Sequence, residues 1–339
     1  GLDPDSTHDS EWVRPLRPAR CSWRVAPLVG VHADPDRPAH FSGLERCSSI
    51  WACPVCSAVI RNERAREIQS AADRWTSAGN SILMLTLTMP HQADDALSTT
   101  LDVALDGYRS MTRLRGWQRL RERVGAVGYI RAVEITVGRR NGWHPHVHVL
   151  LFVTGILDDD QVAGVQADTL SLWSGVVRRR LGREVSVDHG VRVSRASSAD
   201  YVAKVQEHDR AGAEMARSDM KRGGSGNLMP FELLDSPGPW ARSRWLEYVE
   251  ATHARRAITW SRGLRALLEV ADELTDEELI EQTESSQLVA LLDGPDYDAR
   301  RRAGTLPAVL EAAELLVATD PPAAADTQRT TDLGARPGP

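Results

Sequence analysis

The fold follows from residues 128–153, which read GYIRAVEITVGRRNGWHPHVHVLLFV. Apolar and polar residues alternate in both halves of this stretch, as they do in strands that bury one face. The segment RRNGW (139–143) between the halves contains Asn-Gly, which is a hairpin turn signal. The two halves are therefore predicted to pair as an antiparallel hairpin.

Three histidines share one face of the second predicted strand, because alternate residues of a strand point to the same side. They are His144, His146 and His148. A lone buried histidine is usually a satisfied core residue, but three imidazoles on an apolar strand cost free energy unless something binds there. The pattern therefore indicates a functional site.

The neighbouring strand is expected to add a carboxylate to this site. Its apolar alternation leaves Glu134 on the opposite face, and a hairpin loop with an odd number of residues brings that face to the histidines. A five-residue loop, 139–143, would place Glu134 opposite His148. Two histidines and a glutamate suit Mn²⁺ or Mg²⁺. The alternative for Glu134 is a salt bridge to a nearby arginine.

An earlier predicted strand, SILMLTLTM (81–89), has leucines on its core face, which leaves Thr86 and Thr88 beside the same site. The order along the chain is strand, helix, hairpin, helix, strand, helix. This order predicts an α+β fold, with a central antiparallel sheet of about five strands and flanking helices.

A tyrosine and a rare lysine follow the last predicted strand. Tyr201 and Lys204 are three residues apart on a predicted helix and therefore share a face. Such a pair alone is a weak signal, because most lie on solvated surfaces. The chain has only two lysines, Lys204 and Lys221, which gives this pair more weight.

Three segments in this order resemble the motifs of rolling-circle replication initiators, which are His-hydrophobic-His (HUH) endonucleases. The segments are TLTMPH (86–91), WHPHVHVLLF (143–152) and YVAKV (201–205). The chain most resembles initiators of small plasmids from high-GC Gram-positive bacteria, with CPVC (53–56), NLMPFELL (227–234), WLEYVEAT (245–252) and ITWSRGLR (258–265). The likeness covers roughly residues 45–270 and implies the HUH endonuclease fold.

The resemblance also implies the roles of individual residues. His146 and His148 would bind the metal, Tyr201 would be the nucleophile, and Lys204 would assist at the phosphate or metal. His144 would be accessory. Relatives can use a second tyrosine or a nearby carboxylate to end a second strand transfer, and the candidates here are Asp200 and Glu207.

The activity that the resemblance implies is metal-dependent, site-specific nicking of single-stranded DNA. The products would be a 5′-phosphotyrosine bond and a free 3′-OH that primes synthesis. The substrate would be origin DNA, single-stranded or folded as a hairpin, with a host helicase and polymerase as partners.

The four cysteines predict a structural zinc site. Cys47, Cys53 and Cys56 surround a CPVC knuckle, and Cys21 would complete a Cys₄ set. The alternatives are reduced buried cysteines, or a cluster that uses His32 or His40 in place of Cys21.

Composition divides the chain into four expected parts. Residues 1–56 read as an irregular arm with the cysteine cluster, 57–212 as the HUH nuclease domain, and 213–292 as a helical C-terminal extension. Residues 293–339 read as an acidic, low-complexity and largely disordered tail. The net charge is −6, with the acidic excess near the C-terminus. No apolar membrane span or signal pattern is evident, so a cytoplasmic protein is expected.

Two other classes of protein fit part of the pattern. HPHVHVLLF also matches the histidine-triad nucleotide hydrolases and transferases, in which a histidine is the nucleophile and no metal is needed. A non-catalytic, zinc-dependent DNA-binding protein would explain the cysteines but leave the histidine face unexplained. A conjugative relaxase would keep the chemistry, but in relaxases the tyrosine tends to precede the histidines.

Overall fold

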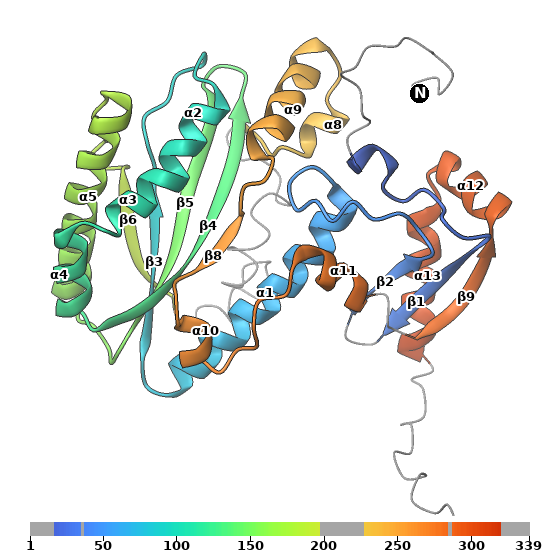
Figure 1. Cartoon of the computed structure of the whole chain (residues 1–339), viewed down its shortest axis with the longest axis horizontal. Helices are drawn as coiled ribbons and strands as arrows, with labels where there is room; N and C mark the ends of the chain where they lie inside the picture. Colours follow the sequence, from blue (N-terminus) through green and yellow to red (C-terminus); the bar gives the residue numbers. More distant parts are fainter. Residues whose placement is uncertain (1–16, 35–36, 197–226, 284–286, 320–339) are drawn as a thin grey trace, which may run out of the picture. The chain divides into compact units, whose positions relative to one another are not determined.

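A computed structural model describes residues 17–34, 37–196, 227–283 and 287–319 (Figure 1). The chain divides into two compact units. One unit comprises residues 48–279, and the other combines 1–47 with 280–339. Each unit is described separately.

The larger unit contains most of the elements. In chain order they are α1 (Pro54–Ser77), β3 (Ser81–Leu87), α2 (Leu97–Asp102), the π-helical turn η2 (Val103–Gly107), α3 (Tyr108–Met111), α4 (Arg115–Arg123), β4 (Ala126–Gly138), β5 (Gly142–Val153), α5 (Asp159–Leu181), β6 (Val191–Ala196), β7 (Asn227–Leu228), α8 (Glu232–Asp235), α9 (Pro239–Thr252), β8 (Ile258–Trp260), α10 (Leu264–Leu267) and α11 (Asp276–Thr283), whose last residues pass into the other unit.

A six-stranded antiparallel sheet forms the centre of this unit. The strand order is β6-β3-β5-β4-β7, and β8 also pairs with β4. The antiparallel α+β prediction is confirmed. The segment 213–292, predicted to be a helical extension, contributes two short strands to this sheet, β7 and β8, as well as helices.

One face of the sheet, here called the core face, is covered by helices. Val147, Val149 and Leu151 of β5 pack in one buried cluster with Trp117 of α4 and Trp173 of α5. The helix α5 begins with a capping box at Asp158 and ends at Gly182 in the left-handed conformation, as its sequence favours. These helices cover the core face, and the histidines lie on the opposite face.

The hairpin turn between β4 and β5 is tighter than predicted. Gly138 pairs with Gly142, so the loop comprises residues 139–141 and not 139–143. Gly142, the residue directly after this loop, adopts φ +71°, which glycine tolerates without strain. The expected pairing of Glu134 with His148 is therefore wrong, and Glu134 pairs with His146. Both loops have an odd length, so Glu134 stays on the predicted face.

The opposite face, here called the histidine face, is covered in part by α1. Trp75 near the end of α1 packs edge-on against Phe152, with ring centroids 6.1 Å apart. The Trp75 indole also donates hydrogen bonds to the carbonyls of Ser81 and Val153. Phe152 lies at the far end of β5 from the histidines.

The smaller unit is built from both ends of the chain. Its elements are η1 (Arg17–Arg20), β1 (Leu28–Asp34), β2 (Arg37–Ser42), β9 (Leu288–Asp293), α12 (Gly294–Ala303) and α13 (Leu306–Thr319). The strands form a separate antiparallel sheet of order β2-β1-β9. Val29, Val31 and Phe41 pack with Tyr297 and Val317 in its core.

This second sheet differs from the sequence-based expectations. The arm predicted to be irregular contains β1 and β2, and the segment predicted to be a tail contains α12 and α13 up to residue 319. The end of the segment predicted to be a helical extension contains α11 followed by the strand β9. The local sequence does not indicate this sheet, because β1 is stabilised by pairing with β9, a strand more than two hundred residues away.

No helix among the described residues is long and apolar enough to cross a membrane.

Candidate functional site

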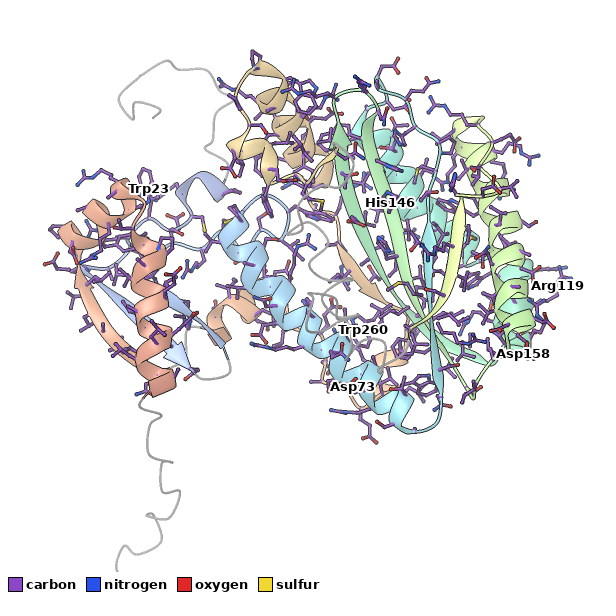
Figure 2. All side chains as sticks on the ribbon, turned by 180° about the vertical axis from the view of Figure 1, so that it is seen from behind. Trp23, Asp73, Arg119, His146, Asp158 and Trp260 are labelled. Carbon is purple, nitrogen blue, oxygen red and sulfur yellow. The ribbon has the colours of Figure 1, made fainter. Side chains whose placement is uncertain are left out.

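The strand β5 presents its histidines in a row on the histidine face, where Figure 2 labels His146. The ring centroids of His144 and His146 are 4.1 Å apart, and those of His146 and His148 are 6.2 Å apart. His148 is buried, whereas His144 and His146 are partly buried. The intervening Val147 is fully buried on the core face, which fixes the direction of the histidines.

A carboxylate joins the row from β4. Oε2 of Glu134 lies 2.8 Å from Nε2 of His148. Glu134 pairs in register with His146, so its side chain leans along the strand toward the next histidine. Long side chains commonly reach such diagonal neighbours. One carboxylate therefore approaches both histidines that the sequence motif singles out.

The third strand supplies a hydroxyl that can orient His148. Thr86 pairs with His148, and its Oγ1 lies 3.3 Å from Nδ1 of that imidazole. A partner on Nδ1 fixes the ring orientation and leaves Nε2 for a ligand. Thr88, also expected at the site, instead donates from Oγ1 to the carbonyl of His189 at 2.5 Å.

An arginine from β6 lies in the same row across the sheet. Arg192 pairs with Thr86, so it shares the face of Thr86 and His148. Its neighbours Val191 and Val193 pack toward the core face, and Arg192 is exposed. The sequence reasoning missed this residue. Alternation in VRVSR was the available signal, but the pairing of β6 with β3 could not be derived from it.

A fourth imidazole extends the row at its other end. The ring of His91 is 4.2 Å from that of His144, and its Nδ1 hydrogen bonds with the carbonyl of Asn141 at 2.8 Å. If Nδ1 carries the proton, Nε2 presents its lone pair. Gly142 permits this approach, because a Cβ there would lie 2.8 Å from the Gln92 carbonyl oxygen. His91 closes the TLTMPH motif, yet the sequence reasoning gave it no role.

Burial keeps the imidazoles of His144 and His146 neutral. Desolvation, together with smaller effects of the neighbouring His146 and His91, lowers the pKa of His144 to about 3. Desolvation also lowers the pKa of His146 to about 4, although the carboxylate of Glu134 opposes this shift. Neutral imidazoles are the form that binds metal ions.

The residues present a donor set that fits a divalent ion, although they do not form a closed cage. Two imidazoles and a carboxylate are suitable ligands for Mn²⁺ or Mg²⁺. In the described part of the chain, only the four cysteines bring three or more ligand atoms within 4.8 Å of one another. His146 would therefore have to turn toward the Glu134–His148 pair for all three to bind one ion.

The predicted nucleophile follows the strand β6 in sequence. Tyr201 and Lys204 lie outside the described residues, as do Asp200 and Glu207. The strand β6 ends at Ala196, five residues before Tyr201. The histidine, glutamate and threonine part of the site is thus described, and the tyrosine part is not.

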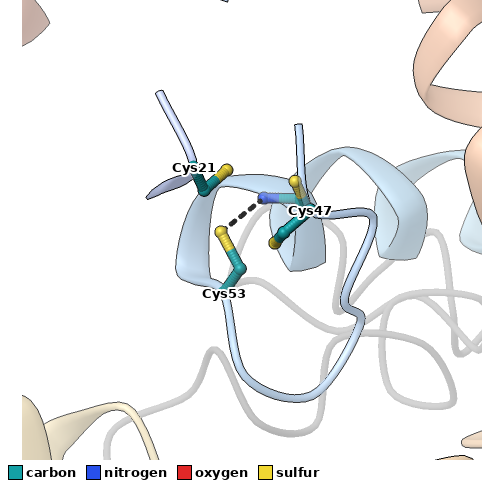
Figure 3. Close-up of side chains that lie close together, drawn as sticks. Cys21, Cys47 and Cys53 are labelled. Atoms are coloured by element: carbon teal, nitrogen blue, oxygen red, sulfur yellow. Dashed lines mark hydrogen bonds between the residues drawn. The ribbon is translucent and has the colours of Figure 1, made fainter. Parts of the chain in front are cut away.

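The four cysteines gather as predicted. One sulfur from each of Cys21, Cys47, Cys53 and Cys56 lies within 4.8 Å of the others (Figure 3). Cys53 is the N-cap of α1, and its sulfur accepts from the backbone N–H of Cys56 at 3.5 Å. Ligand sulfurs around tetrahedral Zn²⁺ are about 3.8 Å apart, given Zn–S bonds of about 2.3 Å. The cluster could therefore hold zinc after small side-chain adjustments.

The chain matches the model of a known protein family. A family model described as "Rep_1: Replication protein" matches residues 44–293. The matched range includes the whole six-stranded sheet and the histidine row.

Curated relatives agree with this match. "Protein rep" of Streptomyces lividans is 35% identical over 293 residues, covering 67% of this chain and 64% of that protein. "Neomycin resistance protein" of Streptomyces cyanogenus is 34% identical over 169 residues, covering 40% of this chain and 38% of that protein. "Protein rep" of Lentilactobacillus hilgardii is 27% identical over 160 residues, covering 46% and 49%. The chain thus spans less than two thirds of the length of each of these relatives.

Proposed function

Because this chain belongs to the Rep_1 family of replication proteins, we propose that it initiates plasmid rolling-circle replication by nicking one DNA strand. The chemistry would be a metal-dependent strand transfer to Tyr201. The product would be a 5′-phosphotyrosine bond and a free 3′-OH, from which a host polymerase extends after a helicase opens the duplex.

The observation that supports this proposal is the contact of Glu134 with His148 beside His146. A salt bridge to arginine is the alternative role for Glu134, and the contact to the imidazole of His148 supports the role of a ligand. A carboxylate and two neutral imidazoles on one sheet face are expected for a metal site and are costly otherwise.

The transfer would proceed by attack on phosphorus. The phenolic oxygen of Tyr201 forms a bond to the scissile phosphorus, the bond from phosphorus to the 3′ oxygen breaks, and a proton passes to that oxygen. A divalent ion held by His146, His148 and Glu134 would supply a Lewis acid for a non-bridging phosphate oxygen. Phosphodiester bond energy is kept in the tyrosine ester, so the step is reversible.

The chain's own side chains would do the remaining work. Thr86 would hold the His148 ring through Nδ1, and Arg192 would offer a guanidinium to the phosphate from the same row of the sheet. Lys204 would stabilise charge on the phenolate or phosphate as a compact cation. A phenol has an ordinary pKa near 10, so such stabilisation is needed for attack at neutral pH.

A covalent adduct is the decisive product. We would incubate the full chain and Mn²⁺ with single-stranded oligonucleotides of random sequence, digest the mixture, and search for nucleotide-modified peptides by mass spectrometry. A nucleotide on the peptide that contains Tyr201 is expected, and Tyr201→Phe should abolish it. The matched control is Tyr129→Phe, which removes a phenol from β4 and should leave the adduct.

Two results would count against the proposal. A nucleotide on a histidine, with Tyr201 unmodified, would support the histidine-triad chemistry. Cleavage by Tyr201→Phe at the wild-type rate would remove Tyr201 as the nucleophile.

A further inference from the structure

The helices on the core side of the larger unit carry a concentration of arginine. Residues 109–123 and 168–184 contain ten arginines and three acidic residues. This contrasts with the chain as a whole, whose net charge is −6. These helices lie across the sheet from the histidine row, since their buried side chains pack on the core face.

Contacts along α5 place these arginines on one continuous surface. Arg123 of α4 pairs with Asp168 at 2.5 Å, and Arg180 donates to Oγ of Ser110 in α3 at 3.0 Å. A Cβ on Gly116 would touch Leu172 at 2.7 Å, so the start of α4 lies midway between these two contacts. The helices α3 and α4 therefore follow α5 over most of its second half (Figure 1).

Four arginines on this surface have no acidic partner. Arg113, Arg115, Arg119 and Arg179 are exposed, and none forms an ion pair within the part of the chain that the structure describes. We call these four residues the arginine surface. Arg115 and Arg119 are one helical turn apart and share a face of α4. Figure 2 shows Arg119 on the outer side of the helices, away from the sheet.

An exposed group of unpaired arginines favours a binding partner that carries negative charges along its own surface. Exposed like charges repel one another and destabilise the free protein, so an unpaired group of four is best stabilised by a partner that carries regularly spaced negative charge. A nucleic acid backbone has this character.

The burial of the aromatic residues beneath the arginine surface favours duplex DNA over single-stranded DNA as the partner. Proteins that bind single strands stack exposed aromatic rings on the bases. The aromatic side chains here, Tyr108, Trp117 and Trp173, are at most 1% exposed. The surface therefore offers guanidinium groups for phosphates and no ring for bases, which is the pattern for duplex DNA.

We propose that the arginine surface binds the phosphate backbone of duplex DNA, separately from the strand that the histidine row would cleave. This proposal rests on the proposed function, because it takes DNA as the substrate. The sheet and one layer of helices separate the two surfaces, a distance of about 20 Å if each layer adds about 10 Å. The duplex so held would be the part of the origin beside the nick.

The salt dependence of binding tests the proposal. Affinity of the full chain would be measured by fluorescence anisotropy, over a series of salt concentrations, for a linear duplex and for a single strand of the same sequence. The triple variant R115S/R119S/R179S should lower the slope of log affinity against log salt for the duplex by up to about 2.7, at about 0.9 for each lost phosphate contact. Its slope for the single strand should change little.

Matched variants distinguish an effect of the arginine surface from an effect of the total charge of the protein. R66S/R242S/R302S removes three exposed arginines elsewhere and should keep the wild-type slope, and R115K/R119K/R179K should keep it because lysine preserves the charge. An unchanged slope in R115S/R119S/R179S overturns the proposal. So does an equal loss in the control triple or an equal loss for the single strand. Binding of the wild type to phosphatidylserine vesicles but not to duplex would also overturn it.

The adduct assay tests the nicking proposal independently of the proposed binding of duplex DNA. A wild-type chain that forms the tyrosine adduct, with no effect of R115S/R119S/R179S on duplex binding, refutes the arginine surface alone. A wild-type chain that forms no adduct refutes the nicking proposal, whatever the duplex measurement gives.

Discussion

The carboxylate of Glu134 lies 2.8 Å from Nε2 of His148, although the strand register places Glu134 directly opposite His146. The side chain thus spans two rows of the sheet. Because of this lean, a single residue of β4 is within reach of both histidines that would bind a metal. The first prediction concerns this residue.

Glu134→Ala should weaken Mn²⁺ binding at least about tenfold, since loss of a partner at a metal site typically costs 10–100-fold in affinity. Titration followed by electron paramagnetic resonance measures this without any nicking assay. Thr136→Ala is the control, because it lies two residues along on the same face, opposite His144. Equal Mn²⁺ affinity in Glu134→Ala and the wild type would exclude Glu134 as a ligand.

Thr86→Val should weaken Mn²⁺ binding by roughly tenfold, because the hydroxyl beside His148 Nδ1 would no longer orient the ring. Thr86→Ser keeps the hydroxyl and should bind as the wild type does. Thr88→Val makes the same exchange at a hydroxyl that bonds to His189. If Thr88→Val has the same effect, the orienting role of Thr86 is refuted.

Arg192→Ala should slow formation of the tyrosine adduct by roughly 10- to 100-fold, because a charge-assisted contact to the phosphate contributes about 1.5–3 kcal/mol. Mn²⁺ affinity should stay the same, which separates this role from that of Glu134. Arg195→Ala is the matched control, since Arg195 is also exposed on β6 but pairs with Asp159. A wild-type rate in Arg192→Ala would remove the residue from the site.

Cys47→Ser should lower the zinc content from about one ion per chain and reduce the melting temperature, because a structural zinc contributes to folding free energy. Cys21→Ser should do the same, whereas the double variant His32→Ala/His40→Ala should retain zinc. Elemental analysis by mass spectrometry gives the content. Full zinc in Cys21→Ser, with loss in the histidine variant, would favour the ligand set that uses a histidine.

Stability of the metal-free protein should fall as the pH is lowered from 6.5 toward 4. The folded pKa values of His144 and His146 are about 3 and about 4, below the unfolded value of about 6.5. In this interval the unfolded chain binds protons that the folded chain does not, so acid favours unfolding. Above pH 6.5 these two groups contribute no pH dependence.

The urea midpoint, measured in EDTA across this range, checks the prediction. His144→Gln/His146→Gln should show a shallower dependence than the wild type, because glutamine does not titrate. Identical pH dependence in both proteins would mean that groups other than His144 and His146 govern the acid response.

The site could be predicted from sequence where its geometry is local. Alternation within β5 gives the histidine face, and an odd loop length gives the side of Glu134 whatever the exact loop. The place of Arg192 depends on which strand β6 joins, and alternation within one strand carries no information about its neighbour.

The fold was likewise predictable where it depends on local sequence, and not where it depends on the pairing of distant strands. Local periodicity predicted α5 and the hairpin, but β1 and β9 are far apart in sequence and their pairing is not encoded in either segment alone. The segment 94–124 reads as helical with a break at Gly116, and the structure has breaks at η2 and at residues 112–114, just before α4 begins. Packing of Gly107 against Val176 of α5 accompanies the break at η2, and no local pattern reports it.

Gly142 has no polar side-chain atom and yet governs how closely His91 approaches His144. Even a methyl group there would collide with the backbone at Gln92 and Ala93, and the left-handed φ would add strain. A mutational screen of this chain should therefore include Gly142. A loss of activity there would point to spacing between two backbone segments, with every imidazole still in the chain.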